Sequence, residues 1–393
     1  MGNYNFDKPI ERANTNCIKF DLMADKGLTK NGLSYWVADM DFETVPEIGE
    51  AIRKRTEHNI YGYSLTGERY YEVLIDWMKR HHGWKTEPEW YFYTPGVVFA
   101  LSMAIRALTK EGDHVMIQRP VYYPFSGMIE QNGRIITNSP LYQDEDGIYR
   151  MNYEDFEEKL VKDQVRLFLL CNPHNPVGRV WTREELLRIG DICVKHGVYV
   201  VADEIHEDFI SEGFHHEVFA NLKPEFAEIS VTCTAPSKTF NLAGLQISNI
   251  IAPNPELKNR VKAELDKTGY DEPNVFGAIA CQAAYEYGEE WLSELKEYLA
   301  GNAAFVEAYL KENMPRVRYR KPEGTYLAWL DFREYGLSKE VLDEKLLKEA
   351  EVWLDSGTMF GEEGEGFERV NLATTRAYLK KGLDRIKEVL EKR

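Results

Sequence analysis

The chain has 393 residues, of which 44% are hydrophobic and 29% are charged, a composition typical of a folded globular protein. Its formal net charge of −17 argues against general binding to nucleic acids or anionic membranes, because their phosphates would be repelled. Its 5 scattered cysteines contain no Cys-x-x-Cys pair, which argues against a disulfide scaffold and against a structural zinc site.

The N-terminus, "MGNYNFDKPIERANTN", is polar and lacks an apolar signal core. No apolar run approaches the roughly 20 residues that a membrane span needs. We therefore predict a cytoplasmic protein that binds neither a membrane nor nucleic acid. The chain is too long for one ordinary core, so we expect two domains. The predicted segments are 1–45 (an N-terminal part of the small domain), 46–285 (a large domain that carries the ligand-binding motifs) and 286–393 (a small C-terminal domain).

Short apolar runs alternate with helical patterns through the middle of the chain. Thr182, Glu185 and Gly197 predict a helix over 182–197 with a capping box and a glycine C-cap. Continuous apolar strands between helices indicate an α/β domain, in which helices flank a mostly parallel sheet. In such sheets ligands bind at the carboxyl ends of the strands. The predicted strands are 113–118, 134–139, 165–171, 198–203, 229–235 and 247–252.

The pattern changes after about residue 285. A long charged helix (288–314) precedes a strand, a turn and a second strand (317–332), and the chain closes with "FERVNLATT" (367–375) and a helix. This order predicts a smaller α+β domain, which the first 45 or so residues complete.

Two motifs follow predicted strands in the large domain. In "CNPHNPVG" (171–178) the prolines and the glycine predict a rigid loop that directs Asn175 toward a ligand, although an ordinary turn explains the motif equally well. In "VYVVADEIHEDF" (198–209) the strand delivers Asp203 to a buried end, where a charge needs a partner. Glu204, His206 and Asp208 match no zinc spacing, so we predict no metal site there.

Two further motifs concern a lysine and a helix start. Lys238 lies just after a predicted strand in "TAPSKTFNLAGLQISNI" (234–250), where small residues permit a close backbone approach. In "YFYTPGVVFALSMAIRAL" (91–108) a Pro-Gly turn opens a helix, whose free N–H groups favour an anion. A solvated lysine and an ordinary strand-to-helix connection are the plain alternatives. Together, an amine, a carboxylate, an asparagine loop and an anion site match the needs of pyridoxal 5'-phosphate (PLP).

The sequence also resembles a known family. The motifs "NPHNPVG", "ADEIH" and "SKTFNLAG" occur in the order found in the fold-type-I, aspartate-aminotransferase-like family, and the resemblance runs nearly end to end. Within that family the chain most resembles the MalY/PatB-type cystathionine β-lyase (C–S lyase) branch. The segments that carry this closer match are "WVADMDF" (36–42), "YGYS" (61–64), "DEIHEDF" (203–209), "SKTFNLAGLQ" (237–246), "GTYLAWLDF" (324–332) and "RVNLATTR" (369–376).

The resemblance implies roles for the residues around the cofactor. Lys238 would form the Schiff base with PLP, and Asp203 would pair with its pyridine nitrogen. Asn175 would bond the phenolic oxygen, and His206 stands where aminotransferases commonly carry a tyrosine in that role. Tyr122 would stack on the ring.

The resemblance also implies roles at the phosphate, the substrate and the partner subunit. Backbone N–H groups near Gly96, Val97 and Val98 would hold the phosphate. Arg369 would bind the substrate α-carboxylate, which a guanidinium fork suits. Tyr63 would reach the active site of a second copy, so that the functional unit would be a homodimer.

The chain departs from the family at two positions that normally touch the phosphate. Ala235 stands where many relatives carry a serine, and Gln246 stands where aminotransferases usually carry an arginine. Ser237 or Tyr63 could take over the phosphate contact. The missing arginine fits the lyase branch better than a typical aminotransferase.

The resemblance predicts β-elimination from an S-substituted L-cysteine, with Lys238 as the base and with Tyr63 or Tyr122 assisting the leaving group. L-Cystathionine would give homocysteine, pyruvate and ammonia; cystine and S-alkyl cysteines are further candidates. The alternatives are an aminotransferase of the same fold and a regulatory protein that retains the cofactor.

Overall fold

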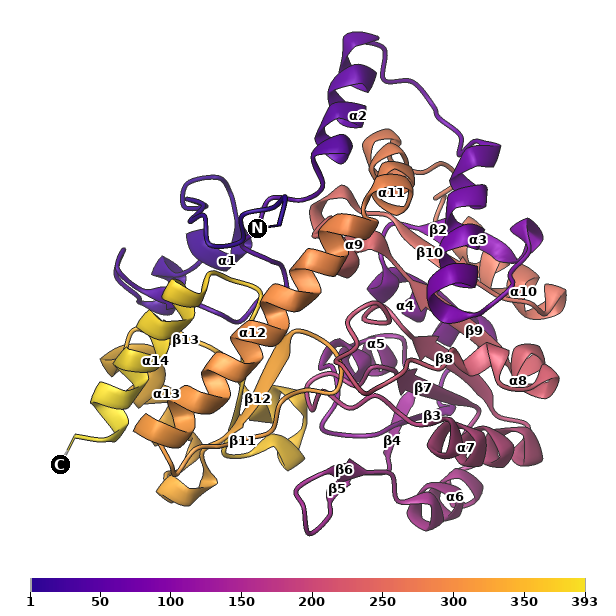
Figure 1. Cartoon of the computed structure of the whole chain (residues 1–393). Helices are drawn as coiled ribbons and strands as arrows, with labels where there is room; N and C mark the ends of the chain where they lie inside the picture. Colours follow the sequence, from indigo (N-terminus) through magenta and orange to yellow (C-terminus); the bar gives the residue numbers. More distant parts are fainter. Residues whose placement is uncertain (1, 393) are drawn as a thin grey trace.

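In a computed structural model of the chain, which describes residues 2–392, a seven-stranded sheet forms the centre of the larger part (Figure 1). Five neighbouring strands run parallel, whereas β10 pairs antiparallel with both β9 and β2. The predicted mostly parallel α/β sheet is confirmed. In spatial order the strands are β2 (Tyr91–Thr94), β10 (Ser248–Ile251), β9 (Ser230–Thr234), β8 (Tyr199–Asp203), β7 (Leu167–Cys171), β3 (His114–Ile117) and β4 (Ile135–Asn138).

Helices cover both faces of this sheet, because alternate side chains of each strand enter different cores. In β7, Leu167 and Leu169 belong to one apolar cluster, and Phe168 and Leu170 belong to another. The first cluster includes α4 (Val97–Leu108), α5 (Pro124–Gln131) and α10 (Pro255–Asp266). The second includes α6 (Tyr153–Lys162), α7 (Arg183–His196) and α8 (Pro224–Ile229).

The helix predicted over 182–197 is confirmed as α7. The Thr182 hydroxyl accepts a hydrogen bond from the Glu185 backbone N–H at 3.2 Å, and the Glu185 carboxylate accepts one from the Thr182 backbone N–H at 2.9 Å. Gly197 ends the helix in the left-handed region, with φ of 65°. These contacts satisfy terminal backbone groups that the helix itself leaves unpaired.

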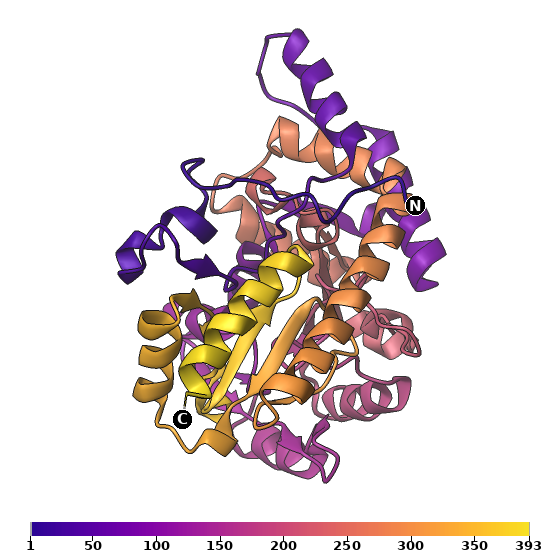
Figure 2. The ribbon, with the colours of Figure 1, turned by 60° about the vertical axis from the view of Figure 1, so that its left-hand side comes forward.

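A four-stranded antiparallel sheet forms the smaller part. Its strands, in spatial order, are β11 (Arg318–Tyr319), β12 (Leu327–Asp331), β15 (Phe367–Asn371) and β14 (Asp355–Ser356). Figure 2 shows α12 (Glu289–Asn313) and α14 (Arg376–Leu390) side by side on one face of this sheet. Val306 of α12, Leu383 of α14 and Leu330 of β12 share one core cluster.

The N-terminal segment contacts both parts of the molecule. Its strand β1 (Leu33–Ser34) pairs in parallel with β13 (Val352–Trp353) beside the smaller sheet. Phe6 instead packs against Phe42 and against Trp291 at the start of α12, in a core that also includes residues of the larger part. The domain boundaries at 45/46 and 285/286 stay predictions.

The remaining elements complete the two parts of the molecule. Within residues 2–392 no helix is both long enough and apolar enough to cross a membrane. The other helices are α1 (Ile18–Asp21), α2 (Pro46–Glu57), α3 (Glu68–His82), α9 (Pro236–Thr239), α11 (Val275–Tyr287) and α13 (Lys339–Glu344), and the other strands are β5 (Tyr142–Gln143) and β6 (Tyr149–Arg150). The 3₁₀ turns are η1 (Ala24–Lys26), η2 (Pro88–Trp90), η3 (Phe219–Asn221), η4 (Ala243–Leu245), η5 (Arg333–Tyr335), η7 (Gly357–Phe360) and η8 (Glu362–Gly364), and η6 (Lys345–Glu349) is a π-helical turn.

Candidate active site

A cavity of about 390 Å³ lies at the carboxyl ends of strands in the large sheet. Its volume falls within the roughly 300–1,000 Å³ that small-molecule sites usually have. Every residue predicted for the site except Tyr63 lines this cavity: Lys238, Asp203, Asn175, His206, Tyr122, Gly96, Val97, Val98, Ser237 and Arg369. The roles predicted for these residues are not tested by their position alone and stay predictions.

Lys238 enters the cavity from α9, the short helix that follows β9. Its Nζ donates a hydrogen bond to the backbone carbonyl of Ala38 at 2.9 Å. Burial lowers the pKa of the Lys238 amine to about 8, with help from the positive charge of Arg369 and against Asp39 and Asp203. A lysine with a pKa near neutrality supplies a neutral amine at moderate pH, which is the form that acts as a base or a nucleophile.

Asp203 is the last residue of β8, and its side chain is buried. The carboxylate accepts one long hydrogen bond, from the Ile205 backbone N–H at 3.3 Å. Burial raises the pKa of Asp203 to about 7, while the Ile205 N–H and the Lys238 charge act in the opposite direction. Within residues 2–392 no cation lies within ion-pair distance of this carboxylate. A buried acid in this state calls for a cationic partner in the cavity.

Arg369, on β15, presents a buried guanidinium that several groups hold in place. Its Nη1 donates to the Asn175 side-chain oxygen at 3.0 Å, and its Nη2 donates to the Trp36 backbone carbonyl at 2.8 Å. Nη2 also forms an ion pair with Asp355, which lies opposite Arg369 in the β14–β15 register. The Nε atom has no hydrogen-bond partner among residues 2–392. Sequence analysis missed Asp355, because no local pattern links it to an arginine 14 residues later.

The loop that carries Asn175 is fixed by backbone contacts. His174 N–H donates to the Arg179 carbonyl at 2.7 Å, and Gly178 N–H donates to the His174 carbonyl at 2.8 Å. Gly178 has a φ of 71°, and a Cβ there would lie 2.6 Å from the Pro322 Cβ, so that this position requires glycine. These contacts make the loop rigid, as the sequence predicts.

His206 lines the cavity as a neutral imidazole. It is buried, and its ring packs edge-on against Tyr326 with ring centroids 5.6 Å apart. Burial, together with the charges of Lys238 and Arg369, lowers the pKa of His206 well below its ordinary value. Its Nδ1 has no hydrogen-bond partner among the described residues. The ring is therefore free to pair with a polar group of a ligand.

The start of α4 faces open space in the cavity. Among the residues that the structure describes, no side chain caps the helix, and a Cβ added at Gly96 would meet no atom within 4 Å. The free N–H groups at such a helix start favour an anion. Of the two positions where the chain departs from the family, Gln246 lines the cavity, whereas Ala235 is buried in the apolar core and is absent from the lining.

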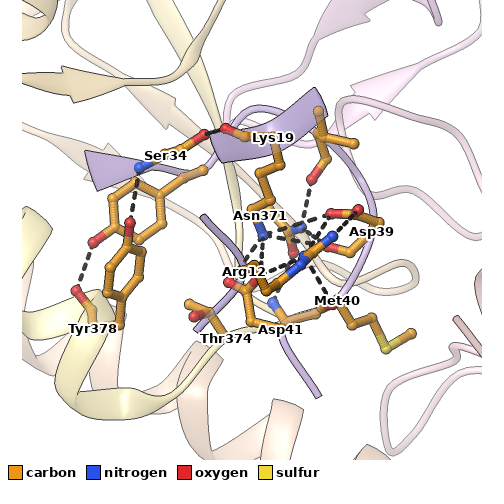
Figure 3. Close-up of polar contacts among 12 residues, drawn as sticks. Arg12, Lys19, Ser34, Asp39, Met40, Asp41, Asn371, Thr374 and Tyr378 are labelled. Carbon is orange, nitrogen blue, oxygen red and sulfur yellow. Dashed lines mark hydrogen bonds and ion pairs between the residues drawn. The ribbon is translucent and has the colours of Figure 1, made fainter. Parts of the chain in front are cut away.

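A segment that sequence analysis did not assign, residues 36–41, borders the cavity and is held along its length (Figure 3). The Asn371 side-chain amide donates to the carbonyls of Val37 at 2.7 Å and Asp39 at 2.6 Å. Arg12 forms ion pairs with Asp39 at 2.6 Å and with Asp41 at 2.7 Å. These contacts fix the segment whose Ala38 carbonyl accepts from Lys238. In the sequence, this segment was noted only because "WVADMDF" (36–42) resembles the cystathionine β-lyase branch, and no role was predicted for it.

Tyr63 lies away from the cavity in this single chain. It is 96% exposed and belongs to the extended segment between α2 and α3. The structure of one chain therefore does not bring Tyr63 together with the other predicted site residues.

Comparison with known proteins agrees with this site. The profile described as aminotransferase class I and II matches residues 36–386. The chain belongs to the aminotransferase class I and II family. Within this family, it is 47% identical to the cystathionine β-lyase PatB of Bacillus subtilis (strain 168), over 98% of this chain and 100% of PatB.

Solved structures of this family are also closely similar to the chain. Cystalysin from Treponema denticola, which contains a pyridoxal 5'-phosphate cofactor, has a TM-score of 0.96 at 36% identity, over 99% of both chains. The PLP-bound C–S lyase from Staphylococcus hominis has a TM-score of 0.91 at 34% identity, over 98% of this chain and 99% of the lyase. The family predicted from the motifs is confirmed.

Proposed function

We propose that this protein is a PLP-dependent carbon–sulfur lyase that cleaves S-substituted L-cysteines by β-elimination. We propose L-cystathionine as the first substrate to test; its products would be homocysteine, pyruvate and ammonia. The full-length 47% identity with the cystathionine β-lyase PatB is the observation that carries this proposal. The similarity to cystalysin and to a PLP-bound C–S lyase supports the same reaction and the same cofactor.

Three features of the cavity fit PLP. Asp203 is a buried acid without a cationic partner, which suits a protonated pyridine nitrogen. The open space at the uncapped start of α4 suits a phosphate. The unpartnered Nδ1 of His206 can pair with an oxygen of the cofactor. When bound, PLP supplies an electron sink that stabilises the negative charge left when the Cα proton of an amino acid is removed.

The residues of the cavity divide the remaining work. Arg369 binds the substrate α-carboxylate through its guanidinium, which Asp355 and Asn175 hold in position. Lys238, whose lowered pKa makes the neutral amine more available, accepts the Cα proton. The Cβ–S bond then breaks, and the sulfur leaves as a thiolate that takes up a proton. The 2-aminoacrylate that remains reacts with water to give pyruvate and ammonia.

The two tyrosines complete the proposed site. Tyr122 lines the cavity and would stack on the cofactor ring. Tyr63 is supplied by a second copy in a homodimer, a proposal supported by its almost complete exposure in one chain. One of the two assists the departing thiolate. Ala235 and Gln246 stand where relatives carry a serine and an arginine that touch the phosphate. Either Ser237, which lines the cavity, or Tyr63 of the second copy makes that contact instead. The cytoplasmic location stays a prediction.

The test is an assay of the purified holoenzyme with L-cystathionine and no keto acid. We expect continuous release of pyruvate together with free thiol. A single turnover that stops, and resumes when a keto acid is added, would make the protein an aminotransferase instead. Lys238→Ala is the control and should abolish pyruvate release. If a cellular effect of the protein persisted in this variant, a regulatory role that needs only binding would replace the lyase.

A further inference from the structure

A second group of chemically active side chains lies outside the cavity. His82 ends α3, Glu207 follows His206 in the loop after β8, and His216 lies in the segment before η3. All three side chains are at most 3% exposed. One ring nitrogen of each histidine and one carboxylate oxygen of Glu207 lie within 4.8 Å of one another. We refer to these three residues as the His–Glu cluster.

Three atoms of the His–Glu cluster lack hydrogen-bond partners in the part of the chain that the structure describes. They are Nδ1 of His82, Nδ1 of His216 and Oε2 of Glu207, and all three are buried. Burying a polar atom without a partner is costly, and native proteins rarely leave several such atoms together. Three unpaired ligand-type atoms on side chains that lie this close together therefore indicate that a partner is missing.

The other ring nitrogens of the two histidines are already engaged. Nε2 of His82 contacts the Asp208 carboxylate at 3.0 Å, and Nε2 of His216 contacts the Glu204 carboxylate at 3.2 Å. Histidines that ligate metals commonly donate their second nitrogen to a carboxylate, which fixes the ring and leaves the first nitrogen as an electron-pair donor. Asp208 is itself held by the Trp77 indole N–H at 3.0 Å.

The carboxylates around the cluster also favour a cation. Glu204, Glu207 and Asp208 bring three buried carboxylates together, and their only ion-pair partners within residues 2–392 are the two histidines. No lysine or arginine in that range forms an ion pair with any of the three. Buried carboxylates are usually paired or coordinate metals.

We propose that His82, Glu207 and His216 bind one divalent transition-metal ion of the zinc class. Two imidazoles and one carboxylate form a ligand set that zinc accepts, with a fourth position left for water. The two rings are nearly perpendicular, at 86°, with centroids 5.6 Å apart. Tetrahedral ligands about 2.1 Å from zinc lie about 3.4 Å apart, so ligand atoms that now lie within 4.8 Å of one another would move closer by at most about 1.4 Å on binding.

The ion would join three segments that are far apart in the sequence. Glu207 belongs to the same loop as Asp203, Glu204 and His206, so an ion at the His–Glu cluster would brace the loop that borders the catalytic cavity. Sequence analysis rejected a site made of Glu204, His206 and Asp208. The fold instead assigns Glu204 and Asp208 to the support of His216 and His82, which local spacing does not reveal.

The experiment is a zinc titration of holoenzyme that has been treated with a chelator and dialysed. We expect one zinc ion per chain by calorimetry and elemental analysis, and an increase of roughly 2–5 °C in Tm at saturation. Glu207→Gln keeps the side-chain volume but loses the charged ligand, so it should weaken zinc binding by about 100-fold or more. His216→Gln is the second variant, with the same expectation. Glu157→Gln, which alters a partly exposed carboxylate beside His196, is the matched control and should bind zinc like the wild type.

The location of the ion decides the result independently of the variants. Anomalous scattering at the zinc absorption edge should give one peak between His82, Glu207 and His216. Binding that is unchanged in both Glu207→Gln and His216→Gln, a peak elsewhere, or no stoichiometric binding by the wild type would overturn the proposal. If either variant failed to fold, the stoichiometry and the anomalous peak of the wild type would still decide it.

Discussion

At the scale of single residues, burial shifts the pKa values of two groups in the cavity in opposite directions. It lowers the pKa of Lys238 to about 8 and raises the pKa of Asp203 to about 7, because in each case the low-dielectric surroundings favour the neutral form. The charge of Asp203 therefore destabilises the cofactor-free protein, although the same carboxylate is needed beside a protonated pyridine nitrogen. A cationic ligand that pairs with Asp203 would relieve this destabilisation of the cofactor-free cavity.

The unfavourable burial of the Asp203 charge predicts that the stability of the cofactor-free protein depends on pH. From about pH 4 to pH 7 the folded protein keeps a proton on Asp203 that the unfolded chain has released, so stability falls as pH rises through this window. Asp203→Asn removes the titrating carboxyl group and with it this loss of stability. The cofactor-free variant should therefore gain stability relative to the wild type across the window, by on the order of 4 kcal/mol in total, and lose lyase activity. Thermal unfolding of both cofactor-free proteins at about pH 5 and pH 8 measures this gain.

Asp191→Asn serves as the control for this comparison. Asp191 is exposed and pairs with Lys223 on the surface, so its substitution should change Tm little, and equally at both pH values. If the difference between Asp203→Asn and the wild type stayed constant or shrank between pH 5 and pH 8, Asp203 would already be ionised in the folded, cofactor-free protein.

At the scale of elements, the register of β14 against β15 places Asp355 opposite Arg369. Asp355→Asn should leave the fold intact but remove the charge that fixes the guanidinium. We expect the KM for L-cystathionine to rise about 10- to 100-fold, equivalent to about 1.4–2.8 kcal/mol of binding, with a smaller change in kcat. Steady-state kinetics of the holoenzyme separates the two constants.

Asp331 offers a matched control in the same sheet. It lies on β12 and pairs with Arg333, away from the cavity, so Asp331→Asn should keep the wild-type KM. A fall in kcat without a rise in KM for Asp355→Asn would mean that Asp355 acts on the chemical step instead of on the position of Arg369.

Elements that depend on neighbouring residues could be predicted from the sequence, whereas contacts between distant segments could not. The capping box of α7 and the strand that ends in Asp203 are local patterns, and both were predicted correctly. The reversed direction of β10 is set by pairing with β9 and β2, which apolar periodicity does not encode. Asp355 escaped prediction for a similar reason, because only the sheet register brings it to Arg369.

At the scale of the whole molecule, the segment between α2 and α3 exposes apolar side chains to solvent, and covering them would be energetically favourable. Ile60 is 63% exposed and Leu65 is 85% exposed, on either side of the exposed Tyr63. Clustered exposed apolar residues commonly mark a surface that another chain covers. A second copy that covers this segment would also receive Tyr63 into its cavity.

A shared site predicts that two inactive variants restore each other. Tyr63→Ala keeps Lys238 but lacks the tyrosine, whereas Lys238→Ala keeps the tyrosine but lacks the base. Random reassortment after mixed refolding gives one complete site in each hybrid dimer, so about a quarter of wild-type activity should return. Pyruvate release from the mixture measures this recovery, and each variant refolded alone is the control. If hybrids form, as shown by differently tagged subunits, but no activity returns, Tyr63 does not serve the partner's site. The exposed segment would then need another explanation.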